Sequence, residues 1–230
     1  MDYVALGDES DAFTRGGNRL CFIDPRDSNR CIKVLRPDRS PEIRRRQKGF
    51  PKNLRSLRSF DENIEEFSVW QSIERLVGEP AFTVISRCYG FVETNYGPGL
   101  VMALIKDSDG KISKTLKQVI WENGLTKELK NTIDNFAARW IELCMPSKKL
   151  LLHNMLLQSL ETENRIYVID GLGWSSLFPI DKFNRRLAQM RAKKKVKELE
   201  FTIEELLRKK EQGINFGYHG WMEDGQRAIK

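Results

Sequence analysis

The chain of 230 residues carries 39 Lys or Arg and 32 Asp or Glu, a formal net charge of +7, and 40% of its residues are hydrophobic. This composition excludes a chain that is disordered overall, and because no apolar run approaches the ~18 residues that cross a bilayer, we expect no transmembrane segment. The acidic N-terminus is unlike a signal peptide and the four scattered cysteines include no CxxC pair, so we expect a cytoplasmic protein without structural zinc or a disulfide scaffold.

The first predicted element is a β-hairpin. Two short apolar runs, 20–23 and 31–35, flank a segment rich in turn formers at 24–29. Side chains alternate between the two faces of a strand, so Ile32 and Val34 share one face while Lys33 lies on the other.

A basic segment follows at 36–60, with nine basic and two acidic residues. Its prolines and its glycine break it into short pieces, which predicts a loop with partial helix. The next segment, 61–77, has apolar residues at spacings of three and four, which predicts an amphipathic helix with Asp61 as its N-cap.

A second hairpin is predicted over 82–105, around the turn formers at 95–99. The clearest helical periodicity in the chain runs from about Thr126 to Cys144 and ends before Pro146. Two short apolar runs, 150–157 and 165–169, then predict a third pair of strands.

The second basic segment, 182–197, has eight basic residues and no acidic one. We predict that it is a helix capped by Asp181. Thr202 and Glu205 form a capping-box pattern, which predicts that a new helix starts at Ile203 and ends near residue 213. Strands dominate the first half and helices the second, which favours an α+β fold with two lobes and a cleft between them.

Four polar residues stand out by their context: Lys33 on a strand, Glu66 on the following helix, Asn154 within an apolar run, and Asp170 before a glycine. Each alone has an ordinary explanation as a solvated side chain or a turn. Their order, however, matches the layout of protein kinases. In that layout a lysine contacts nucleotide phosphates, a glutamate orients it, and asparagine and aspartate oxygens hold Mg²⁺.

The chain resembles the bacterial YrbL family, the PhoP-regulatory-network proteins related to protein kinases. The longest matching block is YGFVETNYGPGLVMALIKDSDG, at 89–110. The other matching stretches are 16–22, 29–34, Glu66 with Trp70, 154–156 and 170–173.

This resemblance implies a small two-lobed kinase-like fold, with a strand-rich N-lobe at 1–105 containing one main helix and a reduced helical C-lobe at 106–230. It implies that ATP binds in the interlobe cleft, near Gly16 and Gly17, with Lys33 on the phosphates. Glu66 would be the partner of Lys33, with Glu65 as the fallback. Asn154 and Asp170 would hold Mg²⁺.

Departures from the kinase pattern leave catalysis open. Lys149 stands where an active kinase has its catalytic aspartate, five positions before the metal-binding asparagine. His153 is a weak substitute for that base, since a histidine in such a loop more often packs its ring. The glycine-rich loop has Thr14 in place of its first glycine, and the stretch after Asp170 is too short for the usual activation segment. The resemblance therefore implies either an ATP-dependent phosphotransferase or a pseudokinase that acts on a regulatory protein partner.

A second hypothesis is a non-enzymatic regulatory adaptor. The basic segments 36–60 and 182–197 could bind nucleic acid or an acidic partner, although solvated surface is their simplest interpretation. No zinc finger, helix-turn-helix or RNA-binding aromatic motif accompanies them, so base-specific recognition is not expected.

Overall fold

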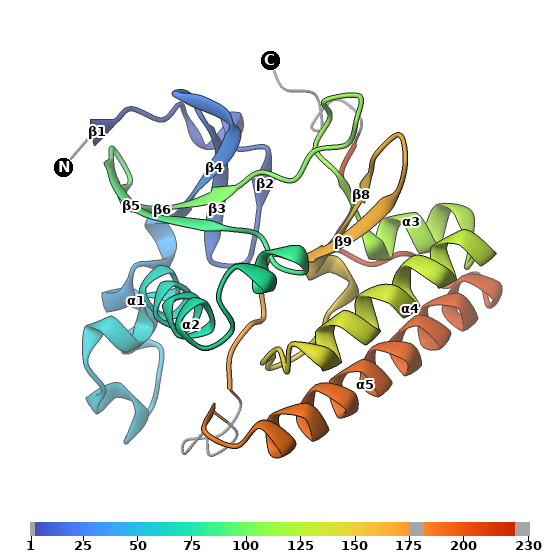
Figure 1. Ribbon diagram of the computed structural model, residues 1–230. Coiled ribbons are helices and arrows are strands. Elements are labelled where there is room, and N and C mark those ends of the chain that lie inside the picture. Colours follow the sequence, from blue (N-terminus) through green and yellow to red (C-terminus); the bar gives the residue numbers. More distant parts are fainter. Residues whose placement is uncertain (1–2, 175–181, 224–230) are drawn as a thin grey trace. The chain divides into compact units, whose positions relative to one another are not determined.

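The computed structural model describes residues 3–174 and 182–223, and its mixture of strands and helices confirms the predicted α+β class (Figure 1). The described residues form two compact units. The first unit comprises residues 3–71 and 87–104, and the second comprises 72–86 and the described residues from 105 onward. The kinase-like division into lobes at residue 105 stays a prediction, and Asp181, the expected helix cap, lies outside the described residues.

The first unit is built on a six-stranded sheet with the order β1-β5-β6-β4-β3-β2. Its first strand is parallel to β5, and all other neighbours are antiparallel. Both hairpins predicted in this half are present, as β3–β4 and β5–β6. The strands are β1 (Tyr3–Val4), β2 (Thr14–Arg15), β3 (Arg19–Asp24), β4 (Asp27–Leu35), β5 (Cys88–Thr94) and β6 (Gly97–Ala103).

Strand β4 lies between β3 and β6 and sets the core of the first unit. Ile32 pairs with Phe22 on one side and with Val101 on the other. Ile32 and Val34 are fully buried, while Lys33 takes the opposite face, as the alternation predicts. The core cluster consists of Val4, Leu6, Leu20, Phe22, Ile32, Val34, Val92 and Val101.

Short helical pieces connect β4 to the main helix of this unit, as predicted. They are η2 (Pro37–Arg39), α1 (Pro41–Arg46), η3 (Lys52–Leu54) and η4 (Leu57–Phe60), and a further turn, η1 (Glu9–Asp11), precedes β2. Helix α2 (Glu62–Val77) follows. Its N-cap is Asp61, whose Oδ1 accepts hydrogen bonds from the backbone N of Asn63 at 2.9 Å and of Ile64 at 3.1 Å.

The second unit combines a three-stranded antiparallel sheet, β7-β8-β9, with helices. Two expected strand starts are wrong. The strand expected from residue 82 begins only at Cys88, because residues 79–83 form a 3-10 helix, η5, with Pro80 in its first turn. Residues 152–154 form another, η6, so the strand begins only at Met155. The elements are β7 (Lys114–Thr115), α3 (Leu116–Asn123), α4 (Lys127–Glu142), β8 (Met155–Ser159) and β9 (Asn164–Val168).

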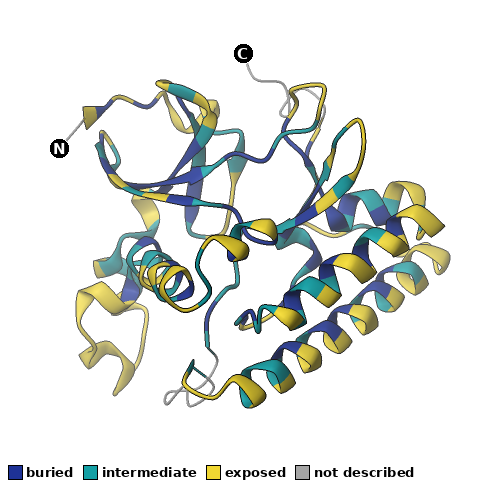
Figure 2. Cartoon of the chain, in the orientation of Figure 1, coloured by how far each residue is buried: buried dark blue, intermediate teal, exposed yellow. Residues whose placement is uncertain are grey.

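The last helix, α5 (Arg185–Glu211), is continuous, so the predicted new helix at Ile203 is wrong (Figure 1). Thr202 bonds the Glu198 carbonyl one turn back at 2.8 Å, as a mid-helix threonine does, instead of capping. An unbroken buried stripe from Ala192 to Leu206 keeps the helix intact (Figure 2). Across residues 3–174 and 182–223, no helix has both the length and the apolarity of a membrane span.

Candidate functional site

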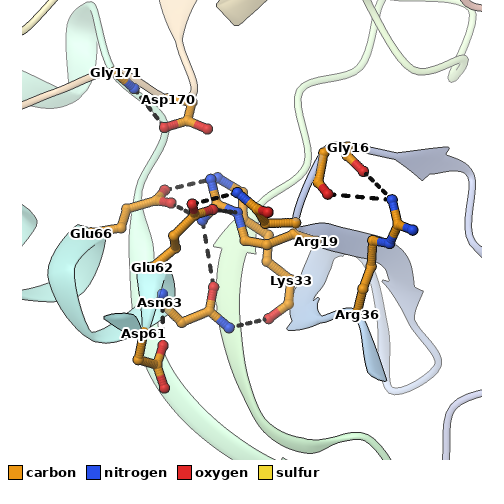
Figure 3. Close-up of polar contacts among 12 residues, drawn as sticks. Gly16, Arg19, Lys33, Arg36, Asp61, Glu62, Asn63, Glu66, Asp170 and Gly171 are labelled. Carbon is orange, nitrogen blue, oxygen red and sulfur yellow. Dashed lines mark hydrogen bonds and ion pairs between the residues drawn. The ribbon is translucent and has the colours of Figure 1, made fainter. Parts of the chain in front are cut away.

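Lys33 and Glu66 form a nearly buried ion pair in the first unit. Lys33 stands on the central strand β4, and its Nζ lies 2.8 Å from Oε1 of Glu66 on α2 (Figure 3). The two side chains are only 8% and 12% exposed. A charge pair shielded from water to this degree interacts more strongly than a surface pair, so Glu66 fixes the position of the lysine ammonium.

Glu66 has a second cationic partner that sequence reasoning missed. Arg19 on β3 donates from Nη1 to Oε2 of Glu66, so the carboxylate lies between two cations (Figure 3). Asn63 ties the group together, since its Oδ1 accepts from Arg19 at 3.4 Å and its Nδ2 donates to the Lys33 carbonyl at 2.8 Å. We call Arg19, Lys33, Asn63 and Glu66 the ion-pair centre.

The helix start explains why Glu66, and not Glu65, meets the lysine. Residues four apart lie on one face of a helix, so Glu62 and Glu66 both point to the sheet. Glu62 accepts from Asn18 Nδ2 at 2.6 Å and pairs with Arg44 at 2.9 Å. Glu65, the fallback candidate, is exposed.

The Gly16–Gly17 turn joins β2 to β3, and Arg36 holds it. Arg36 Nη1 lies 3.3 Å from the carbonyl oxygens of both glycines (Figure 3). Neither glycine has a positive φ. A Cβ on Gly17 would meet nothing within 4 Å, and one on Gly16 would touch only the Arg19 carbonyl at 3.5 Å. Folding does not require glycine here, so a role for these residues in binding stays a prediction.

In the second unit, Asn154 and Asp170 come from neighbouring segments. Asn154 ends η6, just before β8, and its carbonyl accepts from the backbone N of Ile169 at 2.9 Å, at the end of β9. Asp170 follows, and its Oδ1 accepts from Gly171 N at 2.6 Å (Figure 3). The β8–β9 pairing therefore brings the two predicted metal-binding residues into one neighbourhood.

Gly171 is required by this arrangement. Its φ is +81°, and a Cβ would lie 2.8 Å from the Lys149 carbonyl and 3.6 Å from Asn154 Nδ2. The backbone N of Lys148 also donates to the Gly171 carbonyl at 2.9 Å. The segment around Lys149 is thereby held beside Asn154 and Asp170.

Lys149, at the expected position of the catalytic base, and His153, its weak substitute, lie in different surroundings. Lys149 is exposed and contributes its carbonyl to the contact with Gly171. His153 is half-buried, and its ring stacks on His219 with centroids 5.4 Å apart. Burial, followed by the neighbouring His219 and Lys117, lowers the pKa of His153 and outweighs the opposing influence of Asp170.

His219 belongs to a segment that sequence reasoning did not assign, which we call the C-terminal strap (residues 214–222). Lys117 Nζ donates to the carbonyls of Phe216 and His219, both at 2.8 Å, and Gln118 bonds both backbone groups of Met222. The one signal for this packing was the aromatic content after Gly213, which is unusual for a free tail.

The second basic segment borders a cavity of about 580 Å³ within the second unit. One of these basic residues, Lys182, lies 5.1 Å above the Trp174 ring and 3.2 Å from Ser72 Oγ. Among the described lining residues the basic ones are Lys182, Arg185, Arg191, Lys194 and Lys195, and the one acidic residue is Glu142.

The comparisons with known proteins identify the family. A family model described as PhoP regulatory network protein YrbL matches residues 4–204. The chain belongs to this family. YrbL of Escherichia coli (strain K12) and YrbL of Shigella flexneri are each 30% identical to it over 193 residues, which are 79% of this chain and 79% of each relative. The matched region includes the ion-pair centre, Asn154 and Asp170, whereas the C-terminal strap of this YrbL-family chain lies beyond it.

Proposed function

We propose that this YrbL-family protein is a nucleotide-binding regulatory protein with a kinase-like arrangement of groups. The observation that carries the proposal is the nearly buried pair of Lys33 and Glu66, 2.8 Å apart on a central strand and the facing helix. Nucleotide phosphates need a positioned cation, and a lysine held by a carboxylate is how kinases supply one. Lys33 would contact the phosphates of ATP, with Gly16 and Gly17 in the loop that approaches them.

Asn154 and Asp170 would hold the accompanying Mg²⁺. Both present the hard oxygen ligands that this ion prefers, and Mg²⁺ keeps several waters and shares its remaining positions with substrate phosphates. The ion, when bound, neutralises phosphate charge.

Phosphotransfer is reduced or lost in this proposal. In the kinase-like alignment Lys149 takes the sequence position of the catalytic carboxylate, and a lysine ammonium cannot accept the proton of an attacking hydroxyl. The neighbouring His153 has its ring stacked on His219 of the strap. The output of nucleotide binding would then be recognition of a regulatory protein partner.

The test is a thermal-shift titration of the full chain with ATP, in the presence of Mg²⁺ and of a chelator. We expect a rise in Tm with Mg²⁺ and ATP that is absent in Lys33→Met and loses its Mg²⁺ dependence in Asp170→Asn. Lys111→Met is the matched control, because this lysine is exposed and pairs with Asp109 at a turn. An unchanged Tm in the wild type, or equal shifts in all three variants, would refute the proposal.

A second candidate function rests on the cavity beside α5. Five cations and one carboxylate line it within the described part of the chain, which favours an anionic partner such as an acidic protein segment or nucleic acid. Binding should weaken steeply with salt and with charge reversal at Lys193, Lys194 and Lys195. Affinity that is indifferent to both changes would eliminate this candidate.

A further inference from the structure

The segment from the last turn of α1 to just before α2 forms an exposed surface, which we call the basic loop (residues 45–59). All fifteen residues are exposed (Figure 2). It has six basic residues and no acidic one, and within the described residues none of the six forms an ion pair. They are Arg45, Arg46, Lys48, Lys52, Arg55 and Arg58.

The basic loop also exposes large apolar side chains. Phe50 is 83% exposed, Leu54 73% and Leu57 36%. Three exposed apolar side chains therefore lie within eight residues of sequence, interspersed with the cations of the loop.

The base of the loop is fixed, although its body is exposed. Arg44 donates from Nη1 to the carbonyl of Phe60 at 2.5 Å and pairs through Nη2 with Glu62 at 2.9 Å. Phe60 is buried. The loop is therefore closed at its two ends by residues anchored in the first unit, and it presents Phe50 and Leu54 away from the protein core.

We propose that the basic loop is a peripheral docking site for an anionic lipid surface. A bilayer with acidic headgroups satisfies both features at once, because the cations meet phosphate charge while the apolar side chains enter the boundary of the acyl chains. A nucleic acid would satisfy the cations but offers no comparable place for the aliphatic side chain of Leu54. The inference is independent of nucleotide binding.

The test is flotation of the full chain with vesicles of phosphatidylcholine alone or mixed with phosphatidylglycerol. We expect binding only to the mixed vesicles, weakened by salt. The double variant Phe50→Ser with Leu54→Ser should lower the partition coefficient by roughly tenfold or more, and Lys48→Gln and Lys52→Gln by about fivefold each.

Phe201→Ser is the matched control, because Phe201 is 64% exposed on α5 among glutamates and should not affect partition. Thermal melts of every variant confirm folding. The proposal is overturned by absent flotation, by equal binding to neutral vesicles, or by an equal loss in Phe201→Ser. Loss on charge removal with none in the Phe50 and Leu54 variant would also overturn it, because the loop would then be a purely ionic surface whose apolar side chains do not enter the bilayer.

Discussion

Glu66 and Asp170, the two carboxylates placed at the centre of the proposed function, lie in contrasting surroundings. Glu66 is 12% exposed, and each of its oxygens meets a cation, Lys33 on one side and Arg19 on the other. Asp170 is half-buried and accepts a hydrogen bond from the next backbone N–H, in a turn that Gly171 makes possible. Two cations on β3 and β4 therefore hold the first carboxylate, whereas the hydrogen bond of the second to Gly171 lies within its own turn, so we expect a change at Asp170 to cost less stability than one at Glu66.

The largest expected effect that tests this contrast is that of Glu66→Gln. The change removes the carboxylate charge that Lys33 and Arg19 share, while both cations stay nearly buried and Arg19 keeps its longer pairing with Glu62 at 3.8 Å. Breaking such a pair from one side costs about 3–5 kcal/mol of the free energy of unfolding. Urea denaturation of the wild type and the variant measures this loss.

Glu65→Gln is the matched control for that experiment, one position away on the same helix. Because Glu65 is exposed, we expect its loss to stay within about 0.5 kcal/mol. Equal losses in the two variants would contradict the assignment of Glu66 as the partner of Lys33.

A smaller effect is expected for Lys33→Met. Methionine keeps most of the apolar stem of the lysine, and Arg19 still neutralises Glu66, so no buried charge is left alone. We expect a loss of roughly 1–2 kcal/mol, clearly less than that of Glu66→Gln. Urea denaturation in the same buffer gives both values, and a larger loss in Lys33→Met would show that Arg19 does not share the carboxylate.

Much of the ion-pair centre was predictable because its signals are local. Strand alternation placed Lys33 opposite the core face, and Asp61 with the apolar spacing of 61–77 placed a helix start just before Glu66. The role of Arg19 was not predictable. It depends on the contact of Arg19 with the second carboxylate oxygen of Glu66, and the two residues are 47 positions apart in the sequence.

The wrong and missing predictions in the second unit likewise depend on contacts between residues far apart in the sequence. Thr202 and Glu205 carry a valid capping signal, but the buried stripe along α5 outweighs it, and burial is a tertiary quantity. The C-terminal strap is held by Lys117 and Gln118, about a hundred positions away, so no local sequence pattern predicts where it packs.

For Asp170→Asn we expect almost no loss of stability. The amide oxygen of asparagine can still accept from Gly171 N, so the free energy of unfolding should change by no more than about 0.5 kcal/mol. The Mg²⁺-dependent part of the ATP thermal shift should disappear, since a neutral amide is a weaker ligand for this ion. A loss of stability comparable to that of Glu66→Gln would erase the contrast between the two carboxylates.

The smallest expected effect is the pH dependence contributed by His153, next to Asn154. Its pKa is lowered in the folded state by burial and by His219 and Lys117, while Asp170 opposes this. The unfolded chain therefore binds the proton more tightly. Stability is fully present above the usual histidine pKa of about 6.5 and is lost as pH falls toward the folded-state value.

Urea denaturation at about pH 7.5 and pH 5.5 measures this slope in the wild type and in His153→Gln, which cannot titrate. We expect the variant to lose less stability on acidification, because the imidazole that resists protonation beside His219 and Lys117 is gone. Equal losses in the two proteins would assign the acid sensitivity to other groups.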